Sequence, residues 1–259
     1  MANNNDKLIE QILSLKKEKN AVILSHNYQL GEVQDIADFV GDSLELSQQA
    51  AKTDAAVIVF CGVHFMAETA SIISPDKTVL LPDRHAGCPM ADMITPQQLR
   101  EKKKEHPGAI VICYINSSAA VKAESDICCT SSNAVRMVEK VPADKEILFV
   151  PDQYLGSFVA AKTGRELILW PGYCPTHARI QAQDILRLRA EYPQAKVIVH
   201  PECRTEVAAL ADAVLSTGGM IRFARESAAK EIIVGTEIGI LHRLRKENPG
   251  KRFIPVSEQ

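Results

Sequence analysis

The chain has 259 residues, 46% of them hydrophobic, and a formal net charge of −2 at pH 7. This balance is typical of a globular protein, the charge offers no basic surface for nucleic acid, and no apolar run approaches the ~20 residues that span a bilayer. The chain also starts without the basic-then-apolar layout of a signal peptide. We therefore expect a cytoplasmic protein that binds neither nucleic acid nor membrane. Its seven cysteines are expected to be buried thiols or metal ligands rather than a disulfide framework.

The predicted elements begin with an amphipathic helix at about residues 6–19, where apolar residues recur at helical spacing. Strands and helices then alternate to the end of the chain. Short, continuous runs rich in Val, Ile and Leu predict strands at residues 21–25, 55–60, 78–81, 109–113, 147–150, 167–169, 196–199, 232–234 and 252–255. Helices are predicted near residues 64–73, 154–161 and 238–244. Continuous rather than alternating apolar runs favour parallel strands that are covered by helices on both faces.

A pattern of polar residues repeats three times, in residues 21–43, 109–131 and 195–217. In each copy two polar residues close a strand, an aspartate follows twelve residues after the first of them, and a hydroxyl follows five residues later. The matched sets are His26, Tyr28, Asp38 and Ser43; Tyr114, Asn116, Asp126 and Ser131; and His200, Glu202, Asp212 and Thr217. The copies start 88 and 86 residues apart, so the repeat has the size of a small domain.

The repeat predicts an α/β fold with three similar three-layer α/β/α domains, short parallel sheets and pseudo-threefold symmetry around a central site. The predicted domains are residues 1–86, which include the N-terminal helix, 87–172 and 173–259. Ligands of open α/β sheets bind beyond the carboxyl ends of the strands, which is where the repeated polar residues lie.

The repeated polar residues allow two interpretations. The hydroxyls of Ser43, Ser131 and Thr217 stand at predicted helix starts, where they would either cap the helix or help its N-terminus to bind phosphate or carboxylate. The strand-end residues are acid–base and hydrogen-bonding types, although each one alone is better explained as a structural residue. Their alignment in three copies favours a shared site, whereas the three aspartates are expected to brace loops or cap helices.

Cysteines follow the last strand of the first two repeats, at Cys88 and Cys174. By the same logic a third cysteine is expected just beyond Gln259. Three thiolates would suit zinc or an iron–sulfur cluster with one open iron, and His177 is placed to serve the same centre. No Cys-x-x-Cys run is present, so the metal prediction depends on the repeat rather than on close spacing. Cys203 is ambiguous, and the remaining cysteines are expected to be small buried packing residues: Cys61, Cys113, Cys128 and Cys129.

Nine short segments, spread over essentially the whole chain, form a specific set. They are residues 25–29 (SHNYQ), 40–44 (VGDSL), 60–70 (FCGVHFMAETA), 114–116 (YIN), 130–133 (TSSN), 170–177 (WPGYCPTH), 200–203 (HPEC), 216–220 (STGGM) and 235–239 (GTEIG). Together they resemble the quinolinate synthase A family of NAD biosynthesis. The resemblance implies three α/β/α domains around a 4Fe–4S cluster that is held by three cysteines, with an open fourth iron that acts as a Lewis acid. It also implies a transferase that condenses iminoaspartate with dihydroxyacetone phosphate to quinolinate, with loss of phosphate and water.

Carried onto this chain, the resemblance makes Cys88 and Cys174 cluster ligands. It implies proton transfer by Glu202 and Tyr28, with His200 as the partner of Glu202 and Tyr114 as a further catalytic residue. The implied substrate-binding residues are His26, Ser43, Tyr114, Asn116, Ser131, His177, His200, Glu202, Ser216 and Thr217. The implied partners are the two substrates and L-aspartate oxidase, as the source of iminoaspartate. A monomer and a homodimer fit the sequence equally.

Two other functions fit parts of the sequence. One is a zinc hydrolase or lyase that acts on a phosphorylated small molecule. The other is a non-catalytic module that binds small anions and uses its cysteines only for packing. Neither accounts for the threefold repeat together with the family resemblance.

Overall fold

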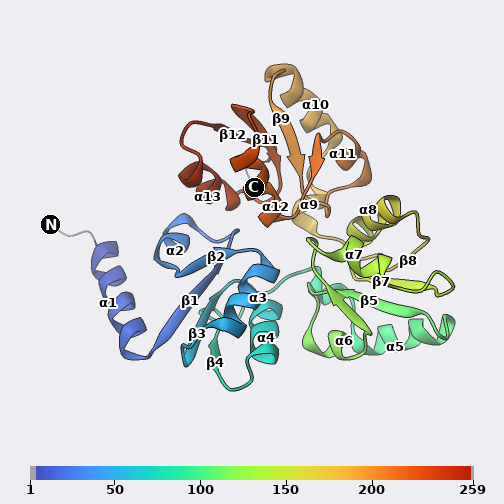
Figure 1. The fold of residues 1–259 in the computed structure, drawn as a ribbon, viewed down its shortest axis with the longest axis horizontal. Coiled ribbons are helices and arrows are strands. Elements are labelled where there is room, and N and C mark those ends of the chain that lie inside the picture. Colours follow the sequence, from blue (N-terminus) through green and yellow to red (C-terminus); the bar gives the residue numbers. More distant parts are fainter. Residues whose placement is uncertain (1–3, 258–259) are drawn as a thin grey trace. The chain divides into compact units, whose positions relative to one another are not determined.

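The computed structural model describes residues 4–257 and contains three four-stranded sheets in that range, all of them parallel (Figure 1). The helix α1 (Asn4–Glu18) precedes the first sheet. That sheet consists of β1 (Ala21–His26), β2 (Phe39–Gly41), β3 (Val57–Cys61) and β4 (Thr78–Leu80), in the order β2-β1-β3-β4.

The second and third sheets repeat this topology. The second consists of β5 (Ile110–Tyr114), β6 (Ile127–Cys129), β7 (Ile147–Val150) and β8 (Ile168–Leu169), in the order β6-β5-β7-β8. The third consists of β9 (Lys196–Val199), β10 (Ala213–Val214), β11 (Glu231–Gly235) and β12 (Arg252–Pro255), in the order β10-β9-β11-β12. The predicted fold class, three similar α/β units with short parallel sheets, is confirmed.

One strand in each sheet was not predicted from the sequence: β2, β6 and β10. Each is an edge strand of two or three residues, too short to stand out as an apolar run. The predicted strands agree with the structure to within two residues at either end.

Helices flank all three sheets. Around the first are α2 (Gly31–Ile36), α3 (Ser43–Lys52) and α4 (His64–Ile73). Around the second are the short 3₁₀ helix η1 (Ala91–Met93), α5 (Pro96–Glu105), α6 (Ala119–Ala123), α7 (Ala134–Glu139) and α8 (Gln153–Thr163). Around the third are α9 (Pro175–Ala178), α10 (Ala182–Glu191), α11 (Thr205–Ala209), α12 (Thr217–Glu226) and α13 (Ile240–Glu247). Within residues 4–257, none of these helices combines the length and apolar character that crossing a membrane requires.

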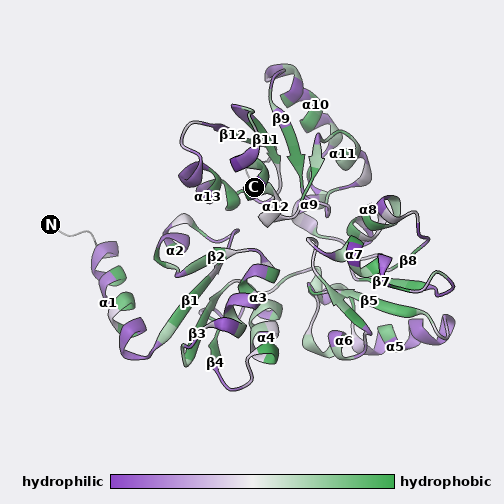
Figure 2. Ribbon diagram, viewed as in Figure 1, coloured by the Kyte–Doolittle hydropathy of each residue, from purple (hydrophilic) through white to green (hydrophobic). Residues whose placement is uncertain are grey.

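The strands carry the apolar core, and the helices cover it with their hydrophobic faces. Figure 2 shows strands coloured mainly as hydrophobic and helices that also bear hydrophilic residues. In the third sheet, for example, Val197, Val199 and Ile233 pack against Ile185 of α10 and Val207 of α11. Full burial of one such side chain contributes about 1.5–3 kcal/mol, so these positions hold the helices on the sheet.

A repeated hydrogen bond fixes the loop between the first and second strand of each sheet. An aspartate after the short helix accepts the backbone N–H of a residue in the preceding strand. The pairs are Asp38 with Ile23, Asp126 with Val111 and Asp212 with Val197, each at 2.8 Å. The prediction that these aspartates brace loops is confirmed.

The described contacts divide the chain into two compact units, Met1–Gly87 and Cys88–Gln259. The first unit contains the first sheet, and the second unit contains the other two. The predicted division into three domains, with boundaries after residues 86 and 172, stays a prediction.

Candidate acid–base and metal site

A buried carboxylate, Glu202, lies at the carboxyl end of β9 and is 3% exposed. The hydroxyl of Tyr114, the last residue of β5, donates to its Oε1 at 2.5 Å. The side-chain amide of Asn116 approaches the same oxygen at 3.4 Å. The two polar strand ends predicted from the second and third repeats therefore meet in space, although 88 residues separate Tyr114 from Glu202.

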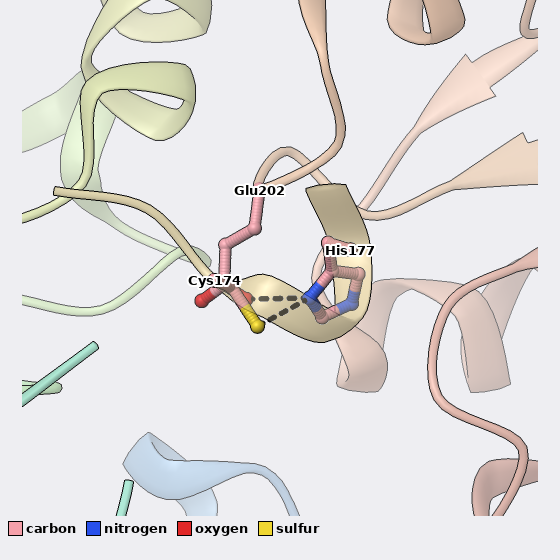
Figure 3. A group of neighbouring side chains, drawn as sticks. All are labelled: Cys174, His177 and Glu202. Carbon is pink, nitrogen blue, oxygen red and sulfur yellow. Dashed lines mark hydrogen bonds and ion pairs between the residues drawn. The ribbon is translucent and has the colours of Figure 1, made fainter. Parts of the chain in front are cut away.

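His177 contacts the other oxygen of this carboxylate. Its Nδ1 lies 2.8 Å from Oε2 of Glu202 and 3.1 Å from Sγ of Cys174 (Figure 3). Cys174 and His177 lie together at the start of α9. Pro175 occupies the first helical position there and fixes the turn. The opposite ring nitrogen, Nε2, lies 2.8 Å from the hydroxyl of Thr236. Polar partners therefore hold the His177 ring at both nitrogens.

His200 stacks on His177, with ring centroids 4.7 Å apart and an angle of 27° between the planes. Its Nδ1 accepts the backbone N–H of Glu202 at 3.3 Å and lies 3.6 Å from Oε2 of that residue. His177 therefore makes the shorter contact with the carboxylate. His200 supports Glu202 through its ring, which accepts the backbone N–H of Glu202 and stacks on His177.

Two carboxyl groups of this region have pKa values displaced in opposite directions. Burial raises the pKa of Glu202, but His200, His177 and the hydroxyl of Tyr114 outweigh it and lower the pKa to about 2. Burial and the nearby charge of Glu202 raise the pKa of Asp152 to about 8. At neutral pH Glu202 is thus ionised and Asp152 retains its proton, a separation of roles that acid–base sites use.

The sequence analysis did not single out Asp152 or Thr236. Asp152 is fully buried, and its Oδ1 accepts the first free N–H groups of α8, from Tyr154 and Leu155. Its Oδ2 has no hydrogen-bond partner within the described part of the chain. Both residues follow the third strand of a sheet, β7 or β11, so a search of every strand end for polar residues would have found them.

Cys174, His177 and Glu202 form a donor set that could hold a metal ion. One ligand atom from each lies within 4.8 Å of the others. Cys88 belongs to the same surroundings, because the charges of Glu202 and Cys174 both act on its thiol. Burial is the largest influence and raises the pKa of Cys88 to about 12. This thiol is therefore neutral unless a cation stabilises the thiolate.

The two thiols of the site, Cys88 and Cys174, fit an iron–sulfur cluster. Thiolates are the usual ligands of such clusters, and Cys88 and Cys174 are both half-buried, reduced and close enough to influence each other electrostatically. His177 and Glu202 then stand beside the thiols as hydrogen-bonding groups. The mixed sulfur, nitrogen and oxygen set also suits zinc.

The remaining predicted residues of the first repeat lie in the first unit. His26 is buried at the end of β1, and its Nδ1 accepts the backbone N–H of Tyr28 at 3.3 Å. The Tyr28 ring packs edge-on against it, with centroids 4.7 Å apart. This is the same ring-to-backbone bond that His200 makes with Glu202. The assignment of His26, Tyr28 and Ser43 to a shared site stays a prediction.

Of the two interpretations of the three repeated hydroxyls, the one in which they cap helices is wrong. Ser43 and Thr217 are the first residues of α3 and α12, but the caps come from the residues before them. Asp42 accepts from the backbone of α3, and Ser216 accepts the N–H of Gly219 at 3.2 Å. A capping side chain must stand just outside the first turn to reach the free N–H groups. Ser131 precedes α7 by more than one residue and does not cap it either.

The prediction for the four packing cysteines holds for two of them. Cys113 and Cys129 are buried, whereas Cys61 is half-buried and Cys128 is exposed. Cys128 lies on the edge strand β6, which the sequence analysis missed, so its apolar neighbours in sequence do not enclose it. Cys203, left ambiguous, is buried in the core of the third sheet.

The fold and the site together define an α/β protein with a buried acid–base cluster beside two thiols. The family model of the quinolinate synthetase A protein matches residues 10–259. A quinolinate synthase of Dehalococcoides mccartyi (strain CBDB1) is 67% identical over 249 residues, which cover 96% of this chain and 82% of the relative. Those of Geobacter metallireducens and Methanosarcina barkeri are 60% and 57% identical, over 97% of this chain and 83% and 82% of theirs. The chain belongs to the quinolinate synthetase A family, and the predicted family resemblance is confirmed.

Among solved structures, the E-1-hydroxy-2-methyl-but-2-enyl-4-diphosphate reductase from Plasmodium falciparum aligns with 97% of this chain and 86% of its own. The TM-score is 0.35 and the identity 12%. A similarity this weak supports no conclusion about a common fold.

Proposed function

We propose that this chain is a quinolinate synthase, which condenses iminoaspartate with dihydroxyacetone phosphate to quinolinate, with loss of phosphate and water, in NAD biosynthesis. The observation that carries the proposal is the buried contact of Tyr114, Glu202 and His177 beside Cys174 in a chain of this family. This contact supplies an ionised carboxylate, a phenol hydroxyl, an imidazole and a thiol in one place.

The proposed cofactor is a 4Fe–4S cluster. Cys88 and Cys174 would hold it, and the bound cluster would supply an open iron that acts as a Lewis acid toward substrate. The third cysteine that the sequence analysis expects beyond Gln259 stays a prediction.

Glu202 is proposed as the base of the condensation and dehydration steps. Its pKa lies near 2, so it is ionised throughout the neutral range and available to accept a proton, although a carboxylate of this pKa is a weak base. Tyr114 and Nδ1 of His177, which contact the two carboxylate oxygens at 2.5 and 2.8 Å, would orient the carboxylate toward substrate. His200 and Thr236 keep the carboxylate and the His177 ring in place. Tyr28 is proposed as the second proton-transfer residue.

The helix starts are proposed to bind the anionic groups of the substrates. In α3 and α12 the caps are made by Asp42 and Ser216, so the hydroxyls of Ser43 and Thr217 are not required as caps. Substrate carboxylate or phosphate would approach the helix N-termini, whose partial positive charge favours anions. Ser131 and Asn116 are proposed to orient substrate from the second repeat.

The test is quinolinate formation from iminoaspartate and dihydroxyacetone phosphate, by protein that is reconstituted anaerobically with iron and sulfide. A small-molecule thiol is included to serve as a further ligand. We expect quinolinate to form only with both substrates and to be lost in Cys174→Ser, while Cys61→Ser, a half-buried thiol of the first unit, retains activity. Quinolinate formation that is unchanged in Cys174→Ser would overturn the assignment of this cysteine.

The donor set of Cys174, His177 and Glu202 also favours a second candidate, a zinc hydrolase or lyase acting on a phosphorylated small molecule. It predicts about one zinc per chain, no sulfide and a colourless protein. Metal and sulfide analysis of the same preparation decides between the two.

A further inference from the structure

Cys113 and Cys128 lie directly opposite each other on neighbouring parallel strands. Cys113 of β5 and Cys128 of β6 are register partners. Adjacent strands are about 4.8 Å apart, and a disulfide needs a Cα–Cα separation of roughly 4.4–6.8 Å. The backbone therefore already holds the two residues at a distance that a disulfide can bridge, although both cysteines are reduced in the structure.

The two thiols have different surroundings. Cys113 is fully buried in the core beside Val111 and Val121, and its thiol donates to the carbonyl oxygen of Tyr114 at 3.3 Å. Cys128 is exposed on the edge strand. The next residue, Cys129, is buried and points to the opposite face of the sheet, because side chains alternate along a strand. Cys113 thus has one cysteine neighbour on its own face, and that neighbour is accessible to solvent.

The same contact makes one thiol more reactive than the other. Interaction with the neighbouring Cys113 thiol lowers the pKa of Cys128; burial opposes this, and the charge of Lys122 adds to the lowering. The hydrogen bond with Cys128 and burial both raise the pKa of Cys113. Because the thiolate is the nucleophile, Cys128 is the attacking thiol and Cys113 the buried one that reacts afterwards.

We propose that Cys113 and Cys128 form a dithiol–disulfide site that exchanges with low-molecular-weight disulfides. The Cys128 thiolate attacks one sulfur of the small disulfide, forms a mixed disulfide and releases one small thiolate. Cys113 then attacks Sγ of Cys128, which closes the protein disulfide, and its proton leaves on the second small molecule, which is released as a thiol. The protein dithiol is oxidised, and the small disulfide is reduced to two thiols. The site uses neither Cys88 nor Cys174.

The test uses the intact reduced protein and oxidised glutathione at neutral pH. Samples are quenched with iodoacetamide over time and digested with trypsin. Cys113 then lies in peptide 105–122, and Cys128 and Cys129 lie in peptide 123–136. We expect the two peptides to become joined, with Cys129 alkylated, and to separate again on reduction. Glutathione should attach to Cys128 at least ~10-fold faster than to Cys61, whose pKa burial raises to about 11.

Two variants identify the role of each thiol. In Cys113→Ser, glutathione should remain attached to Cys128, because no second thiol displaces it. In Cys128→Ser, both the glutathione adduct and the joined peptides should be lost, whereas Cys61→Ser should behave as the parent protein. Glutathione that stays on Cys128 while Cys113 is intact, or joined peptides that persist in Cys128→Ser, would overturn the proposal. The readout does not involve quinolinate, so it is independent of the proposed function.

Discussion

At the end of β5 the chain presents Tyr114 and Asn116, whereas at the matched end of β9 it presents His200 and Glu202. The two strands occupy the same place in sheets of the same order, and the loops beyond them are braced by the same aspartate bond, from Asp126 or Asp212, at 2.8 Å. The braces are alike, but the strand ends are not. One supplies neutral hydrogen-bonding groups and the other an ionised carboxylate.

The difference shows which part of the repeat carries the architecture and which part carries the chemistry. A brace must satisfy a strand N–H in every copy, so its residue type stays the same. The strand ends of two copies meet, at 2.5 Å between Tyr114 and Glu202, so they have to be complementary rather than identical. Changes at the strand ends should therefore affect activity, whereas changes at the braces should affect stability.

The largest expected effect is that of Glu202→Gln. Replacing the proposed base with an amide of similar size should lower quinolinate formation by about 10²-fold or more, because acid–base catalysis typically contributes 10²–10⁴-fold. The measurement is kcat with both substrates saturating. Glu206→Gln, an exposed change four residues further on, is the control and should leave kcat as it is. Full activity in Glu202→Gln would remove this residue from the chemistry.

Tyr114→Phe should have the next largest effect. It deletes the hydrogen bond to Oε1 of Glu202, and bonds to charged groups contribute about 1.5–3 kcal/mol. We expect kcat to fall about 10–100-fold. Tyr192→Phe changes a hydroxyl that contacts Arg252 instead and should have no effect on kcat. A change in KM alone would make Tyr114 a substrate contact only.

Asp126→Ala and Asp212→Ala should destabilise the protein by similar amounts. Each leaves a strand N–H without its partner, of Val111 or Val197, at a cost of about 1–3 kcal/mol. Urea denaturation, compared with the exposed Asp144→Ala, measures the loss. If only one of the two variants loses stability, the aspartate bond does not play the same structural role in the second and third sheets.

The smallest expected effect is a pH dependence of the Asp212 brace. Burial raises the pKa of Asp212, but the hydrogen bonds from Lys196 and Val197 and the charge of Arg189 outweigh it and lower the pKa. The contribution to stability is therefore present above the unfolded pKa of about 3.9 and is lost as the pH falls through the lower folded value. The stability difference between the parent protein and Asp212→Asn should shrink from pH 7 to about pH 3. A difference that grows on acidification would contradict this sign.

Much of the fold followed from the sequence because parallel strands buried on both faces read as continuous apolar runs. The edge strands β2, β6 and β10 could not be predicted in this way, because two or three residues are too few to form a recognisable apolar run. That omission also hid the exposure of Cys128. The braces were predictable because their offsets repeat in all three copies.

The candidate site was predictable in its members but not in its contacts. His177, Glu202 and Tyr114 stand out as strand-end or near-cysteine residues, but the sequence favoured His200 as the partner of Glu202, and His177 lies closer. Which ring nitrogen meets which oxygen depends on the turn after Pro175, and spacing alone does not fix it. Asp152 was missed because a carboxyl that caps a helix looks structural until its burial is known.

The most direct test of the account is the iron and sulfide content of anaerobically reconstituted protein, together with its visible spectrum. The parent chain is compared with Cys88→Ser, Cys174→Ser and Cys61→Ser. With a small-molecule thiol present as the further ligand, we predict a brown protein with about four iron and four sulfide per chain. The iron and sulfide content should be strongly reduced in the first two variants and unchanged in the third. A colourless protein, or a cluster that survives in both Cys88→Ser and Cys174→Ser, would contradict the assignment of these two thiols and the function built on them.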